Sequence, residues 1–288
     1  MSGIKLSAKE QQALNSFQEQ TYLEASKPRS FWQINKQSIL CILLQEYRRN
    51  KNEWVDNIFS QIIGAIIYFL VFGTLIGRFV GDIDGIPYIN FIVPGFIAMT
   101  LIMTAYDQGV WFLYFKKYDQ SITSFQTSPI SPHAFIIGQA IASFIRCLFV
   151  LTCIYLLSWI FTGVTTIAHP FLALSVVLLV SILGANLGVI GGLYANTWEQ
   201  CFFVSTFIIQ PLIYVSGVFY SVDQVPGILS KISQFNPISY IVSSSRYAFY
   251  EHAMTWVNPY YTLIILSVLI VITYIWIKIL LRKFFNMR

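Results

Sequence analysis

The chain has 288 residues, 56% of them hydrophobic and only 11% charged, with a formal net charge of +5. A soluble domain carries about 25% charged residues, so the composition excludes a soluble protein and predicts an all-α integral membrane protein. The positive charge would suggest nucleic-acid binding in a soluble protein, but membrane topology accounts for it here, and no nucleic-acid partner is expected.

The N-terminal 30 residues are polar and lack the apolar run of a secretory signal peptide, so residues 1–30 are predicted to be a cytoplasmic tail. The transmembrane domain is predicted to cover residues 31–285. At its start, over residues 31–49, apolar side chains such as Leu40 and Tyr47 share one helical face, and basic residues follow. This pattern predicts an amphipathic helix in the cytoplasmic membrane interface. A soluble helix packed on a partner stays open as the alternative.

Six stretches are long and apolar enough for membrane-spanning helices, which need about 20 mainly apolar residues. They cover residues 58–80, 88–112, 134–161, 170–195, 201–220 and 259–281. With both termini in the cytoplasm, thirteen Lys and Arg residues fall on the inner side and three on the outer side. Because basic residues accumulate on the cytoplasmic side, both termini are predicted to be cytoplasmic.

Glycines recur at four-residue spacing near the first and fourth spans. They are Gly73, Gly77, Gly81 and Gly85 in the first case and Gly184, Gly188 and Gly192 in the second. Small residues at this spacing let membrane helices approach closely. Packing within one subunit explains them at least as well as a subunit interface.

Two ionisable residues lie within predicted spans, Asp107 in the second and Arg146 in the third. Charges inside membrane helices face a protein interior or water. We therefore predict that the two side chains form a pair or act as polar anchors facing the bundle. A proton relay would need further acids, so a structural role is favoured.

The polar segment Lys116–His133 separates the second and third spans and ends with Pro129 and Pro132. A helix does not run easily through these prolines, so a short cytoplasmic helix is predicted over Tyr118–Gln126. A polar helix held between two spans is expected to be the docking surface for a separate motor subunit. A second cytoplasmic turn is predicted between the fourth and fifth spans, at residues 195–200.

The stretch 222–257 has the character of neither a span nor an ordinary loop. Pro226, Pro237 and Pro259 break it into short apolar pieces. Two short re-entrant helices fit this pattern, because irregular backbone is tolerated at membrane depth where protein or water covers it.

The chemistry of an enzyme is missing from the sequence. It has no phosphate-binding loop, no HExxH or GxSxG motif, and its four cysteines and three histidines lack metal-ligand spacing. We therefore expect no catalytic, metal or cofactor site. A transport subunit driven from outside itself is the simplest interpretation. A membrane-embedded lipid-modifying enzyme and a secondary transporter are the alternatives.

Six motifs in order carry a resemblance. They are FGTLIGRFVGDIDG (72–85), NFIVPGFIAMT (90–100), TSPISPH (127–133), WEQ (198–200), GVFYSVDQVP (217–226) and NPISYIVSSSRY (236–247). In this order and spacing the chain resembles the membrane subunits (permeases) of ABC-2 type transporters over about residues 35–285. Many members have Pro where Ser221 stands here, a difference that concerns only the local turn.

The resemblance implies a homodimer in the bacterial inner membrane that pairs with two copies of an ABC ATP-binding subunit, which carries the ATP and Mg²⁺. It also implies export of a lipid-linked, glycan-type or drug-like amphipathic substrate. Three groups of site residues follow from it. The ATPase-coupling helix would use Tyr118, Asp119, Gln120, Ser121, Ile122, Phe125 and Gln126. The second cytoplasmic contact would use Trp198, Glu199 and Gln200, and the outer gate would use Pro226, Asn236, Pro237, Tyr240 and Arg246.

Overall fold

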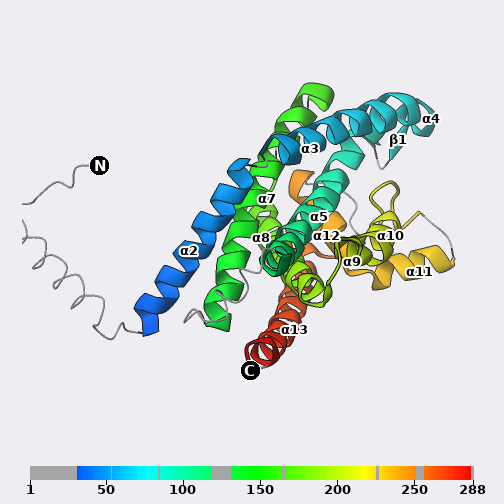
Figure 1. The fold of residues 1–288 in the computed structure, drawn as a ribbon. Helices are drawn as coiled ribbons and strands as arrows, with labels where there is room; N and C mark the ends of the chain where they lie inside the picture. The colour runs from blue at the N-terminus through cyan, green and yellow to red at the C-terminus, as the bar shows by residue number, and fades with distance from the viewer. Residues whose placement is uncertain are drawn as a thin grey trace, which may run out of the picture.

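The computed structural model describes residues 31–52, 54–83, 85–118, 131–163, 167–224, 227–250 and 256–286. Over these residues nearly every element is a helix, and the long helices pack side by side in one bundle (Figure 1). The exception is a hairpin of two short strands, β1 (Asp82–Ile83) and β2 (Ile86–Pro87). The predicted all-α class is therefore confirmed.

Five helices in the described part of the chain are long and apolar enough to cross a membrane. The first, Phe59–Val80, combines most of α3 (Trp54–Tyr68), a π-helical segment (Phe69–Ile76) and α4 (Gly77–Val80). The others are α5 (Tyr88–Tyr118), α7 (Pro132–Thr162), α8 (Pro170–Tyr194) and the part of α13 (Pro259–Asn286) that ends at Arg282. They match five of the six predicted spans, although α5 continues beyond the predicted end at residue 112.

Prolines set several of the helix starts. Pro132, Pro170 and Pro237 each occupy the first turn of a helix, where the missing N–H costs no hydrogen bond. The α7 helix is also capped at both ends. The Ser131 hydroxyl accepts a hydrogen bond from the Ala134 amide at 3.1 Å, and Gly163 ends the helix with φ of 66°.

The predicted fifth span at residues 201–220 is a shorter helical run. It consists of α9 (Trp198–Val204), a π-helical segment (Ser205–Ile209) and α10 (Gln210–Tyr214). At about 1.5 Å per residue the run is about 26 Å long, and turns follow it to residue 220. Its membrane crossing therefore stays a prediction.

This run nevertheless lies along α5 from one end to the other. Trp198 packs on Trp111 near the end of α5, with ring centroids 4.6 Å apart. Beyond the run, the Phe219 carbonyl accepts a hydrogen bond at 3.3 Å from the hydroxyl of Tyr88, the first residue of α5.

The centre of the bundle is the contact between α5 and α8. A Cβ atom added at Gly188 would collide with the Tyr106 carbonyl, and one added at Gly109 would collide with the Ala185 carbonyl. The glycine pattern of α8 therefore serves packing within one chain. Of the four glycines near the first span, only Gly73 and Gly77 lie in helical segments. Gly81 and Gly85 lie beyond α4 with φ of 72° and 77°, so the prediction of a helical small-residue face is wrong for these two residues.

The α2 helix (Phe31–Asn52) runs beside the first half of α7 (Figure 1). The Ser131 hydroxyl donates to the Asn35 side chain at 2.7 Å, and Ile42 lies against Gly138. The face turned inward ends in a buried Glu46, whereas Leu44 and the other apolar residues of the opposite face are exposed. An outward apolar face suits contact with lipid. The location of α2 in the membrane interface stays a prediction.

Two short helices occupy the stretch that the prolines divide, α11 (Ile228–Phe235) and α12 (Pro237–Phe249). Most of α12 is buried against α5 and α8, whereas α11 exposes Ile228 and Phe235. The two helices meet at Pro237, as the sequence predicts. Their re-entry into the membrane stays a prediction.

Candidate functional site

The predicted coupling helix begins at the last residue of α5. Tyr118 is 73% exposed and stacks on Tyr114, with ring centroids 6.2 Å apart. The other predicted coupling residues lie outside the described residues. They are Asp119, Gln120, Ser121, Ile122, Phe125 and Gln126. The structure therefore gives only the base of this helix, on the exposed end of α5.

Aromatic rings join the end of α5 to the start of α9. Trp111 packs on Trp198 and on Phe202, with ring centroids 4.6 Å and 5.2 Å apart. Tyr114 meets Trp198 edge to face at 6.1 Å. Because Tyr118 stacks on Tyr114, the α5–α9 aromatic cluster brings together the first residues of the two predicted cytoplasmic contacts. Aromatic pairs of this kind add about 0.5–1.5 kcal/mol beyond the area they bury.

Lys117, near the end of α5, hydrogen-bonds to the end of α8 beside the α5–α9 aromatic cluster. The Lys117 ammonium donates hydrogen bonds to the Leu193 carbonyl at 2.6 Å and the Ala195 carbonyl at 2.9 Å. These carbonyls are at the end of α8, where a helix leaves acceptors unsatisfied and favours a cation. From the sequence, Lys117 counts only among the basic residues of the inner side, although a lysine at a helix end is also a signal for capping.

Trp198, Glu199 and Gln200 are all exposed at the start of α9. The Gln200 side-chain oxygen accepts a hydrogen bond from the Asn196 amide at 2.7 Å and so fixes the turn before the helix. Glu199 hydrogen-bonds with its own amide and with Thr197, which lowers the pKa of its carboxyl below the ordinary value. The start of α9 therefore presents an ionised carboxylate beside an exposed tryptophan.

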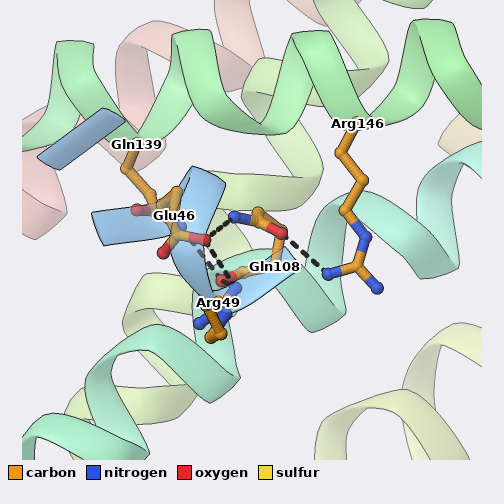
Figure 2. A network of polar contacts seen from close by, with 5 residues as sticks. All are labelled: Glu46, Arg49, Gln108, Gln139 and Arg146. Carbon is orange, nitrogen blue, oxygen red and sulfur yellow. Dashed lines mark hydrogen bonds and ion pairs between the residues drawn. The ribbon is translucent and has the colours of Figure 1, made fainter. Parts of the chain in front are cut away.

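A second, buried group of polar side chains connects α2, α5 and α7, and Figure 2 shows it. It consists of Glu46, Arg49, Gln108, Gln139 and Arg146. Arg49 forms an ion pair with Glu46 at 2.8 Å, and the Gln108 amide nitrogen donates to the same carboxylate. Arg146 donates to the Gln108 side-chain oxygen at 2.8 Å, and Gln139 donates to the Gln108 carbonyl at 3.0 Å. Gln108 is therefore the hub of this polar cluster.

Arg146, one of the two residues of the predicted Asp107–Arg146 pair, belongs to this polar cluster. The hydrogen bond described above joins Arg146 to Gln108, the residue that follows Asp107 in α5. Direct pairing of Asp107 with Arg146 stays a prediction. Sequence reasoning missed Gln108 as the hub and did not predict a role for Glu46 in the cluster.

Four of the predicted outer-gate residues are described in the structure, Asn236, Pro237, Tyr240 and Arg246, whereas Pro226 is outside the described residues. Asn236 caps α12 by accepting from the Ile238 amide at 2.9 Å and donates to the Leu212 carbonyl at 2.5 Å. Pro237 follows as the first residue of α12. The Tyr240 carbonyl accepts from a threonine hydroxyl of α13 at 3.2 Å.

Arg246 is buried in α12 and holds the turn that follows α10. It donates hydrogen bonds to the Gly217 and Val218 carbonyls, and its guanidinium lies 3.7 Å from the centre of the Phe91 ring. Gly217 has φ of 81°, a left-handed conformation that favours glycine. Side chains from α5 and α12 thus hydrogen-bond to the backbone carbonyls of this turn.

The bundle of long apolar helices defines a multi-pass integral membrane protein, and comparison with known proteins specifies its family. The sequence model of the ABC-2 type transporter family matches residues 37–250. The inner membrane transport permease YadH of Escherichia coli (strain K12) is 34% identical over 208 residues, which cover 72% of this chain and 81% of that protein. The chain therefore belongs to the ABC-2 type transporter family.

Two more distant relatives are nodulation proteins. Nodulation protein J of Rhizobium leguminosarum bv. viciae is 23% identical over 208 residues, covering 70% of this chain and 80% of that protein. Nodulation protein J of Rhizobium meliloti is 22% identical over 205 residues, covering 69% and 78%. The similarity to these proteins extends over the bundle rather than over one motif.

Proposed function

We propose that this chain is the membrane-spanning permease subunit of an ATP-driven exporter in the bacterial inner membrane. The observation that carries the proposal is the α5–α9 aromatic cluster. Tyr118, Trp198 and Glu199 are exposed where ring contacts join the end of α5 to the start of α9. Family membership and the printed name of the YadH relative, an inner membrane transport permease, support it.

The partner in this proposal is a separate ABC ATP-binding subunit, present in two copies, which binds ATP and Mg²⁺. The permease itself is a homodimer that needs no cofactor of its own and catalyses no reaction. The coupling segment Tyr118–Gln126 meets the ATPase, and Trp198, Glu199 and Gln200 form the second contact.

Force from the ATPase then has a defined route through the permease. Closure of the two ATPases pushes the coupling segment, which continues directly from α5. Because the glycine contacts seat α5 on α8 with no space for a Cβ atom, the push moves both helices together. The movement opens a path between the two permease subunits.

The topology in this proposal has six crossings, with the predicted span at residues 201–220 as the fifth and both termini in the cytoplasm. The support is geometric, since the segment from Trp198 to Phe219 accompanies α5 from one end to the other. Its exposed aromatic side chains, Phe203, Phe207 and Tyr214, suit an amphipathic, lipid-linked or glycan-type substrate, because aromatic faces accept acyl chains and sugars.

Co-purification tests the proposal. The chain is co-expressed with an ABC ATPase encoded beside its gene, and wild type is compared with the combined Tyr118→Ala, Asp119→Ala and Phe125→Ala variant. We expect wild type to retain the ATPase in a one-to-one ratio and the triple variant to lose it. The control is Tyr260→Ala with Tyr261→Ala, which removes two exposed tyrosines at the start of α13.

The outcomes separate three possibilities. Loss of the ATPase only in the triple variant supports the docking surface. Equal retention by both variants moves the contact away from the coupling segment. Absence of the ATPase from the wild-type sample contradicts the proposed function.

A further inference from the structure

An open groove lies between α2, α3 and α7. It has a volume of about 690 Å³ and is lined mainly by apolar side chains, including Leu44 and Tyr47 from α2 and Ile145 and Phe149 from α7. All four side chains are exposed in the bundle. In a bilayer an apolar groove on the outside of a helix bundle is filled by lipid or by another protein, so its charges indicate the occupant.

The charges at this groove are mainly basic. Lys51 and Arg146 line it, and the exposed Arg48 is on the same part of α2. Glu46 is the acid in the lining, and its charge is balanced by Arg49 at 2.8 Å and by the hydrogen bond from Gln108. Basic pockets beside membrane helices attract anionic lipid head groups, with about 1 kcal/mol for each Lys or Arg near the surface.

The groove also lies next to the start of the first apolar span. The first apolar span begins at Phe59, and Gln61, in the first turn of that span, is part of the groove lining. The basic residues Arg48, Arg49 and Lys51 come shortly before the span in the sequence. The groove therefore has a basic side on α2, shortly before the first span in the chain, and an apolar side along α7.

We propose that this groove binds an anionic phospholipid of the surrounding bilayer. The phosphate interacts with the basic side chains that line the groove, and an acyl chain lies along Ile145 and Phe149. The occupant is a lipid and not a second protein, because the groove combines a basic surplus with acyl-chain-sized apolar walls at the start of a span. This proposal does not depend on the ATPase partner or on the direction of transport.

Native mass spectrometry of the purified chain in detergent tests the lipid site. Phosphatidylglycerol and phosphatidylcholine, which share acyl chains but differ in net head-group charge, are titrated separately. We expect preferential retention of phosphatidylglycerol. Lys51→Gln is expected to weaken that retention about fivefold, and Ile145→Trp is expected to remove most of it because the indole ring obstructs the wall along which the acyl chain lies.

Two matched controls remove similar groups elsewhere. Lys231→Gln removes an exposed lysine of α11, and Ile160→Trp adds an indole at a position of α7 that is 74% exposed and outside the groove. Both controls should bind phosphatidylglycerol as wild type does. Because Lys51 and Ile145 are exposed, all four variants should melt at the wild-type temperature without lipid, which separates loss of the site from loss of the fold.

Three results would overturn the proposal. The first is equal retention of the two lipids by wild type. The second is unchanged binding in Ile145→Trp, which would place the lipid elsewhere. The third is an effect of Ile145→Trp without an effect of Lys51→Gln, which would leave an apolar groove with no recognition of the phosphate.

Discussion

Glu46 illustrates how a charged residue is kept inside this bundle. Its side chain is 2% exposed, and its carboxylate meets both the Arg49 guanidinium and the Gln108 amide. Removing a charge from water is costly, and a buried pair is stable only when hydrogen bonds satisfy its remaining groups. Gln108 supplies such a bond and also accepts from Arg146, so the residues of the polar cluster depend on one another.

Substitution of Glu46 is expected to be strongly destabilising. Glu46→Ala leaves Arg49 without its acid and should lower the free energy of unfolding by about 3 kcal/mol, measured by thermal or denaturant unfolding in detergent. Adding Arg49→Ala should restore part of that loss. The control, Glu199→Ala, changes an exposed acid and should leave the melting temperature unchanged. Equal effects of Glu46→Ala and Glu199→Ala would contradict a cooperative polar cluster.

The partners of Glu46 explain why this cluster escaped sequence reasoning. Glu46 and Arg49 are one helical turn apart, and this local pair is visible in the sequence. Gln108 is 62 residues away from Glu46, and its role depends on how three helices pack. A glutamine inside an apolar run gives no local sign of being a hub, whereas Asp107 and Arg146 attract attention because a charge in a span is rare.

At the scale of elements, the α5–α8 pair is the most constrained contact in the bundle. A glycine in an exposed helix is unfavourable, by roughly 0.5–1 kcal/mol relative to alanine, and here it permits contact between backbones. Gly109 and Gly188 face each other across the interface, and each lies against backbone atoms of the other helix. Backbone cannot move aside as a flexible side chain can.

Gly188→Ala is expected to separate the two helices. The added methyl would overlap the Tyr106 carbonyl, and overpacking of this kind costs about 1–3 kcal/mol, which a lower melting temperature in detergent would report. The matched control is Gly64→Ala in α3, where nothing lies within 4 Å of the new Cβ atom. Gly64→Ala should be neutral or stabilising. Equal effects of the two substitutions would refute the close backbone contact.

The glycines also mark the limit of prediction at this scale. Four-residue spacing correctly placed Gly184 and Gly188 on one helix face, but it could not say which helix lies opposite. The same spacing failed for Gly81 and Gly85, because the helix ends before them and their positive φ values belong to a turn. Spacing shows a shared face only where the helix continues, and tertiary contacts help to decide where it stops.

At the scale of the whole molecule, the number of crossings decides on which side each terminus lies. Five long helices alone would put the termini on opposite sides, whereas a crossing by Trp198–Tyr214 puts them on the same side. Hydropathy identified the five long spans because each is a long run of mainly apolar residues. The predicted fifth span at residues 201–220 is shorter in the structure, because the helical run ends at Tyr214 and a turn held by Arg246 takes the place of its last residues.

Cysteine labelling in intact cells can decide this topology. Asn196→Cys and Asp223→Cys place exposed thiols at the two ends of the run, and the wild-type chain with its four cysteines measures the background. We expect a membrane-impermeant thiol reagent to label only Asp223→Cys, and to label Asn196→Cys after permeabilisation. Labelling of both positions, or of neither, in intact cells would show that the run does not cross the membrane.

The polar contacts of α2 also impose an order on how the protein is made. Glu46 and Arg49 leave the ribosome long before Gln108, and Arg146 emerges later still. The inward face of α2 therefore has no complete partner until α5 and α7 are both in the bilayer. We therefore expect α2 to pack against α5 and α7 only after both are inserted, as one of the last steps of biogenesis. A nascent chain that stops before α7 would leave this helix open to proteases.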